Sequence, residues 1–269
     1  MTGPPDRMLA GIGAARLGRV PLAVAMAIAG AWILAVVAQT SGSNELLHHD
    51  SLIHSDLPSW GALALFLVAW QTMIAAMMLP SSLPLLRLFA AASANQPRPQ
   101  AVVWAFIGGY ALVWTTFGAL AFTGDFVVHQ AVHDVPWLRD HPWLIAAGVL
   151  LGAGAFQFSE LKDRCLEKCR HPAAFLLRHY DRGVGAGFRL GRGHGMFCLG
   201  CCWALMLVTF AAGVANLWWM AALTALMVYE KTGDGGRRSV PVTGIVLLAW
   251  GVLVALHPSW LPGALEGAL

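Results

Sequence analysis

The chain has 269 residues, of which 58% are hydrophobic and only 12% are charged. A soluble domain carries about a quarter charged residues, so this composition predicts an integral membrane protein. The net charge of +3 does not indicate nucleic-acid binding, because the basic residues lie in short segments between apolar runs. We therefore expect a single integral membrane domain over 1–269, with the lipid bilayer as its partner and no nucleic acid.

The apolar runs predict an all-α fold, a polytopic transmembrane helix bundle of about seven spans. Five clear runs cover 20–38, 60–79, 101–123, 143–158 and 240–256. Two further limbs, 198–212 and 216–229, are shorter than the roughly 20 residues that a span needs, so two thin spans and one re-entrant hairpin both remain open. Pro80 and Pro84 predict a break or kink in the second helix just after Met78.

The distribution of basic residues predicts the orientation of the bundle. With the N-terminus inside and seven spans, all of the 17 Lys and Arg residues except Arg139 face the cytoplasm. We therefore expect a multi-pass inner-membrane protein with a cytoplasmic N-terminus and an extracytoplasmic C-terminus. Residues 159–196 then form a cytoplasmic loop rich in arginine and cysteine.

All five cysteines lie in two clusters, Cys165 with Cys169 and Cys198 with Cys201 and Cys202. If both segments are helical, spacings of three and four residues place the sulfur atoms of each cluster on one face. Disulfides rarely persist in the cytoplasm, so these thiols point to a soft metal or to transient redox chemistry. The alternative is that the cysteines pack as small apolar residues.

Such thiolates predict an inner-face site for copper or zinc. A tetrahedral zinc site would take four of the cysteines, with His171 or His194 able to substitute, whereas copper(I) needs only two or three thiolates. The segment that joins the clusters is long enough for its ends to meet, so we expect them to converge. Thioethers also select copper(I), and Met73, Met77 and Met78 lie on the second span, although methionine in an apolar helix usually fills gaps.

A second site on the outer face is a further hypothesis. His48 and His49 lie in the first segment predicted to face outward, and His129 and His133 lie in the second. Imidazole suits zinc or copper(II), but exposed loops also tolerate histidine freely.

Four basic residues flank the first cysteine cluster: Lys162, Arg164, Lys168 and Arg170. We expect most of them to contact anionic lipid headgroups, although they would also favour thiolates. The sequence contains no serine nucleophile elbow, phosphate-binding glycine loop or His-Glu-x-x-His pair, so an enzyme is not the favoured interpretation.

Three stretches resemble a bacterial family, the predicted metal-binding integral membrane proteins of unknown function. They read Trp70-x-x-Met73-x-x-x-Met77-Met78-Leu79-Pro80-Ser81, Leu161-Lys162-x-x-Cys165-Leu166-x-x-Cys169-Arg170-x-Pro172-x-x-Phe175 and Gly195-x-x-Cys198-x-Gly200-Cys201-Cys202-Trp203-x-Leu205-Met206. Asn216-Leu217-x-Trp219-Met220 and Glu230-Lys231 also fit, while Ser159-Glu160 stands where the family usually has Thr-Pro. The resemblance covers about residues 60–256 and implies a metal and a bacterial inner membrane, without specifying which metal.

Three functions remain open at this stage. The leading hypothesis is a metal-binding integral membrane protein that handles or transports copper or zinc through its cytoplasmic thiolates. An alternative is a membrane thiol-disulfide oxidoreductase that uses the Cys198/Cys201 and Cys165/Cys169 pairs. The third is a structural subunit of a membrane complex.

Overall fold

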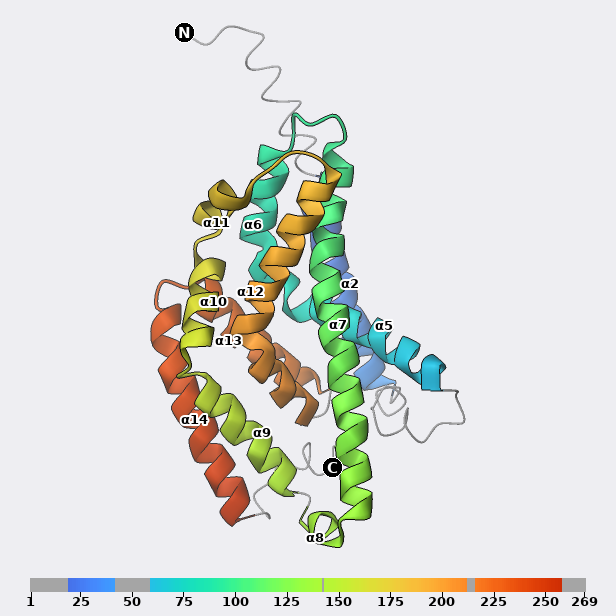
Figure 1. Ribbon diagram of the computed structural model, residues 1–269, viewed down its shortest axis with the longest axis vertical. Helices are drawn as coiled ribbons and strands as arrows, with labels where there is room; N and C mark the ends of the chain where they lie inside the picture. The colour runs from blue at the N-terminus through green and yellow to red at the C-terminus, as the bar shows by residue number, and fades with distance from the viewer. Residues whose placement is uncertain (1–18, 42–58, 142, 212–215, 258–269) are drawn as a thin grey trace, which may run out of the picture.

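The computed structural model describes residues 19–41, 59–141, 143–211 and 216–257. All regular elements in these residues are helices, which together form an elongated bundle (Figure 1). In chain order they are α2 (Arg19–Thr40), α5 (Ser59–Met77), α6 (Leu79–Ala92), α7 (Pro99–Asp134), α8 (Pro136–Arg139), α9 (Trp143–Phe156), α10 (Glu160–Arg170), α11 (Pro172–His179), α12 (Val184–Ala211), α13 (Leu217–Thr232) and α14 (Gly236–Leu256). The expected all-α class is confirmed for the described residues.

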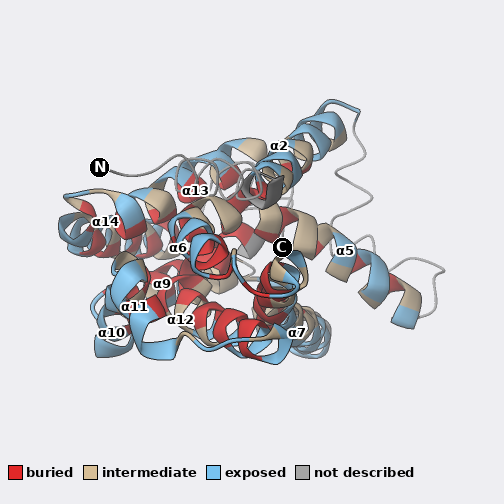
Figure 2. Cartoon of the chain, turned by 90° about the horizontal axis from the view of Figure 1, so that it is seen from above, coloured by how far each residue is buried: buried red, intermediate tan, exposed pale blue. Residues whose placement is uncertain are grey.

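Four stretches are helical, long and apolar enough to cross a membrane: Leu22–Thr40, Trp60–Met77, Pro99–Val132 and Gly236–Leu256. A fifth candidate is the pair of α9 and α10, which are bent by 65° at the break between them. Large apolar side chains such as Leu22, Ile33 and Val246 are exposed on these helices. Seen from above, exposed residues cover the outer faces of α2, α5 and α14 (Figure 2). An apolar exterior of this kind suits lipid contact.

Helix α7 runs along most of the length of the bundle (Figure 1). Its 36 residues correspond to roughly 54 Å at 1.5 Å per residue, well beyond the roughly 30 Å of a hydrocarbon core. Helices α6, α11 and the first part of α12 lie around the upper end of α7, while α9 and α14 pack side by side in the lower half. Helices α7 and α12 therefore extend from the upper part of the bundle into the lower part, where α9 and α14 pack.

Glycines allow α7 and α12 to pack backbone against backbone. Gly187 and Gly191 on α12 lie so close to α7 that a side-chain carbon on them would overlap the carbonyl oxygens of Val102 and Phe106. Gly109 on α7 has the same relation to the backbone of α12. These glycines therefore fix both the distance between the two helices and their register.

Two segments differ from the sequence-based expectation. The limb expected to begin at Cys198 is the second part of α12, which runs unbroken through Val184–Ala211, so its length is no longer short for a span. Residues 159–196, expected as a loop, are mostly helical, because they contain α10, α11 and the start of α12. The glycines that suggested flexibility there instead serve close packing against α7. The turn expected after this limb falls largely on 212–215, outside the described residues.

The second expected span does break at Met78, which confirms the prediction from its prolines. Helix α5 ends one residue before Met78, and α6 begins one residue after it. Pro80 has no N–H to donate to the carbonyl of Ala76, four residues earlier. The indole of Trp32 on α2 donates to this carbonyl at 3.2 Å. The break therefore leaves the freed backbone group satisfied.

We expect Gly191→Ala to destabilise the bundle, and Gly193→Ala to leave its stability unchanged or raise it by up to about 1 kcal/mol. A methyl group at 191 would overlap the α7 backbone, whereas at 193 the nearest atom is the Phe175 ring at 3.9 Å. Overpacking of this kind costs about 1–3 kcal/mol, while alanine gains up to about 1 kcal/mol in helix propensity. Thermal unfolding of both variants in detergent measures the difference. Equal loss in the two variants would contradict the close-packing account.

Candidate metal centre

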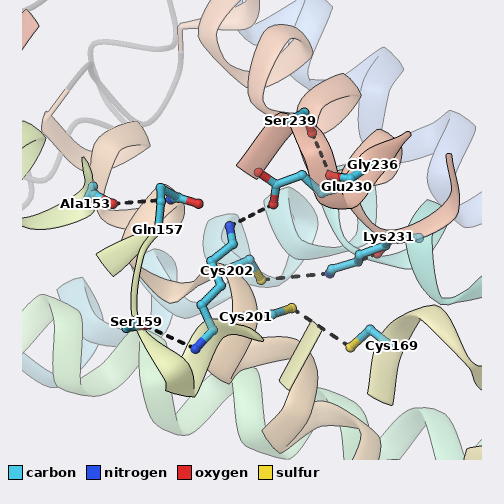
Figure 3. Close-up of polar contacts among 12 residues, drawn as sticks. Ala153, Gln157, Ser159, Cys169, Cys201, Cys202, Glu230, Lys231, Gly236 and Ser239 are labelled. Carbon is cyan, nitrogen blue, oxygen red and sulfur yellow. Dashed lines mark hydrogen bonds and ion pairs between the residues drawn. The ribbon is translucent and has the colours of Figure 1, made fainter. Parts of the chain in front are cut away.

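The two cysteine clusters meet where α10, α12, α13 and the break at Met78 come together. All five cysteines are buried free thiols. The sulfur atom of Cys169 on α10 lies 3.9 Å from that of Cys201 on α12, as Figure 3 shows. Cys165 lies against Gly200, because a side-chain carbon there would come within 2.5 Å of its sulfur. The expected convergence of the two clusters is therefore confirmed.

The three cysteines of α12 share one turn of helix. The thiols of Cys201 and Cys202 donate to the carbonyl oxygen of Cys198 at 3.1 and 2.7 Å. The thiol of Cys202 also lies 3.6 Å from the thioether sulfur of Met78. Met73 and Met77 are buried in the hydrophobic core on α5. Of the three methionines predicted as possible ligands, Met78 is therefore the one whose sulfur contacts a cysteine.

The ammonium group of Lys231 on α13 lies among these sulfur atoms. Its nitrogen is 3.1 Å from the sulfur of Cys198 and 3.2 Å from the hydroxyl oxygen of Ser81. The sulfur atoms of Met78 and Cys202 each lie 3.9 Å away. Figure 3 shows the side chain pointing toward Cys202, and only 4% of the residue is exposed. A cationic group therefore occupies the space between three sulfur atoms.

A chain of polar groups continues from Cys198 toward α6. The hydroxyl of Tyr110 on α7 lies 3.2 Å from the sulfur of Cys198. The hydroxyl oxygen of Ser82 on α6 lies 3.4 Å from that hydroxyl, and the Nε2 atom of His194 lies 3.1 Å from Ser82. His194 is thus buried near the centre and connects to Cys198 through Ser82 and Tyr110.

The basic residues of α10 behave differently from our expectation. Lys162 is fully buried, and its nitrogen lies 2.8 Å from a carboxylate oxygen of Glu230 on α13. Arg170 donates to the backbone carbonyls of Glu230 and Gly233 at 2.5 and 3.0 Å. Contact with lipid headgroups is therefore wrong for Lys162. Lys162 and Arg170 both hold α10 against the end of α13. Arg164 is exposed, as expected, and pairs within α10.

The remaining predicted ligands lie apart from this cluster or outside the described side chains. The imidazole of His171 is 61% exposed and lies 3.1 Å from the carboxylate of Glu167. Four histidines of the hypothetical outer site are not covered: His48, His49, His129 and His133. The first two lie outside the described residues, and the other two lie on the last turns of α7, with side chains that are not described. The outer site stays a prediction.

The donor geometry gives two sulfur atoms at a separation suited to one metal ion. Within the described part of the chain, no three His, Cys, Asp or Glu side chains are grouped so as to hold a metal ion. The four-ligand zinc site is therefore not formed there. The Cys169–Cys201 separation of 3.9 Å is close to the roughly 3.8 Å between two sulfur ligands 2.3 Å from one tetrahedral ion. Two thiolates at this separation form a partial sulfur ligand set, which a soft ion such as copper(I) accepts.

Four residues of the centre were not predicted as site residues: Lys231, Ser81, Ser82 and Tyr110. Lys231 carried a signal, because a charged residue at the end of an apolar segment is a functional-site candidate in a membrane protein. Ser81 and Lys231 also stand in stretches that carry the family resemblance. Ser82 and Tyr110 carried no signal, since a serine near a proline and a tyrosine in an apolar run are common in any helix bundle.

Comparison with known proteins bears on the same residues. Residues 67–254 match the family model described as "PpoB2: Copper chaperone", and this range contains every residue of the centre described above. No curated protein and no solved structure matches the chain. Because the matched range covers well over half of its length, the chain belongs to the PpoB2 copper chaperone family.

Proposed function

We propose that this protein binds copper(I) through the buried sulfur atoms of its cysteines and Met78 and passes the ion on. The observation that carries the proposal is the approach of two cysteine sulfurs from different helices, Cys169 and Cys201, to 3.9 Å. Copper(I) prefers soft sulfur ligands and accepts low coordination numbers. The copper chaperone family to which the chain belongs supports the same metal.

The sulfur atoms form two neighbouring sets. One is the Cys169–Cys201 pair, and the other combines Cys198, Cys202 and Met78. Cys201 and Cys202 are consecutive on α12, so the two sets adjoin. A copper(I) ion held by two ligands can take a third before it releases the first. Such ligand exchange moves the ion between the sets without its leaving sulfur, which suits a protein that transfers copper.

The bundle is, in this proposal, a multi-pass protein of a bacterial inner membrane with seven crossing helices: α2, α5, α7, α9, α12, α13 and α14. Two of these are thin, since α9 has 14 residues and α13 has 16. The asymmetric distribution of basic residues supports a cytoplasmic N-terminus and an extracytoplasmic C-terminus. The sulfur centre then lies at the cytoplasmic end of the membrane part.

A thiol-disulfide oxidoreductase is the second candidate. The Cys169–Cys201 approach of 3.9 Å also favours it, because a small movement would allow a disulfide near 2.05 Å. This pairing joins one cysteine from each of the predicted pairs. Transport of zinc and a purely structural role stay predictions without an observation that favours them.

We expect Cys201→Ser to remove most tightly bound copper(I), because the hard hydroxyl replaces a sulfur that adjoins both sets. Met78→Leu is expected to weaken copper(I) binding about tenfold, equal to about 1.4 kcal/mol, while Met73→Leu serves as the matched control. Anaerobic competition against a coloured copper(I) chelator, with detergent-purified protein, measures the affinities. Unchanged affinity in Cys201→Ser, or no copper in the parent protein, would overturn the proposal.

Topology is tested with single cysteines on a cysteine-free background. A cysteine at Ser51 should react with a membrane-impermeant maleimide in intact spheroplasts, whereas one at Gly185 should react only after permeabilisation. Gly185 is exposed near the start of α12, so burial does not explain its protection. Reaction at Gly185 in intact spheroplasts would exclude the proposed orientation.

A further inference from the structure

The pocket that contains Lys231 already holds a cation among soft donors. Its ammonium nitrogen lies 3.1 Å from one cysteine sulfur, 3.9 Å from another and 3.9 Å from the thioether of Met78. A buried charge is costly unless it is paired or well hydrogen-bonded. The neighbouring carboxylate, Glu230, forms an ion pair with Lys162, 2.8 Å away. The Lys231 cation is therefore stabilised in large part by the donors that copper(I) prefers.

We propose that the Lys231 ammonium and a copper(I) ion are alternative occupants of the pocket formed by Met78, Cys198 and Cys202, so that copper(I) enters by displacing the lysine side chain. This inference rests on the proposed function. A metal bonded to sulfur lies roughly 2.3 Å from each ligand, and the same sulfur atoms surround the ammonium nitrogen. Two cations that share these ligands would be in contact and would repel each other strongly in a dry site.

The exchange favours a monovalent soft cation. With the same number of thiolates before and after the exchange, copper(I) in place of the ammonium group leaves the net charge of the pocket unchanged, whereas a divalent ion adds one positive charge to a buried site; each thiol that newly ionises lowers this charge by one for either ion. Any thiol that coordinates releases its proton to water, the lysine leaves with its own proton, and copper stays copper(I) throughout. Lys231 is in this way a specificity-determining residue of the site.

The position of Lys231 permits this movement. It is the penultimate residue of α13 (Leu217–Thr232), and Gly233 follows the helix. A lysine side chain has a flexible four-carbon stem and can extend its charged end toward water from the end of a helix. When the ammonium returns, it competes with copper for the same sulfurs. An internal competitor of this kind lowers the apparent affinity and aids release to an acceptor.

Affinity measurements test the displacement. If the ammonium occupies the pocket nine-tenths of the time, Lys231→Gln should raise the apparent copper(I) affinity about tenfold, because the competitor is removed. Lys231→Arg retains a cation and should show no gain. Lys168→Gln, which removes a lysine outside the pocket, should also show none. Weaker copper(I) binding in Lys231→Gln would mean that the lysine balances the charge of the bound complex, and the inference would be wrong.

Lysine labelling of the unaltered protein provides a second, independent readout. The chain has three lysines, Lys162, Lys168 and Lys231. With an amine-reactive reagent and mass spectrometry, loading with copper(I) or silver(I) should expose Lys231, whereas zinc(II) should not. Lys168 should react throughout, and Lys162 should stay protected.

The two readouts separate this inference from the proposed function. If the protein binds copper(I) and Lys231 stays protected, the displacement is wrong and copper binding stands. Equal labelling of Lys231 with zinc(II) would overturn the monovalent selectivity. If no copper(I) binds to the protein, the proposed function and this inference both fail.

Discussion

The contact between the backbones of α7 and α12 determines where the sulfur centre can form. Gly187 and Gly191 place the carbonyl groups of α7 directly against α12. Cys198 follows Gly191 by seven residues, about two helical turns, so it lies on the same stripe of the helix. Helices α7 and α12 are therefore still close together two turns further along α12, where the hydroxyl of Tyr110 lies 3.2 Å from the sulfur of Cys198. A larger residue in place of Gly187 or Gly191 would move α12 away from α7 and would also separate Tyr110 from Cys198.

The proline break supplies the second wall of the centre. In an unbroken helix the side chains after Met78 would continue along α5, but the bend turns the first residues of α6 toward α13. The hydroxyls of Ser81 and Ser82 donate to the carbonyl of Met78 at 2.9 and 3.3 Å, which satisfies the backbone at the corner. The hydroxyl oxygen of Ser81 accepts from the ammonium group of Lys231 at 3.2 Å. The hydroxyl oxygen of Ser82 lies 3.1 Å from the Nε2 atom of His194. One break thus provides a soft sulfur and two hard oxygen atoms.

The common side of the two cysteine clusters and the length of the segment between them predicted that the clusters converge, and proline stereochemistry predicted the break at Met78. Burial was not predictable in the same way. The positive-inside pattern predicts a side of the membrane for Lys162, but it does not reveal the ion pair of this fully buried residue. His171 is two residues from Cys169, yet α10 ends between them and directs the imidazole outward.

Charged contacts at the end of α13 hold this helix against α10, so the proposed movement of the Lys231 side chain does not require the helices to move. The buried Lys162–Glu230 pair and the bonds from Arg170 to the last carbonyls of α13 tie α10 to that helix. Cations at a helix C-terminus are stabilised by its dipole, so these contacts reinforce each other. The helices that carry Cys169 and Lys231 are therefore held at a constant spacing. A cation exchange at the sulfur atoms then requires movement of a single side chain and no rearrangement of the bundle.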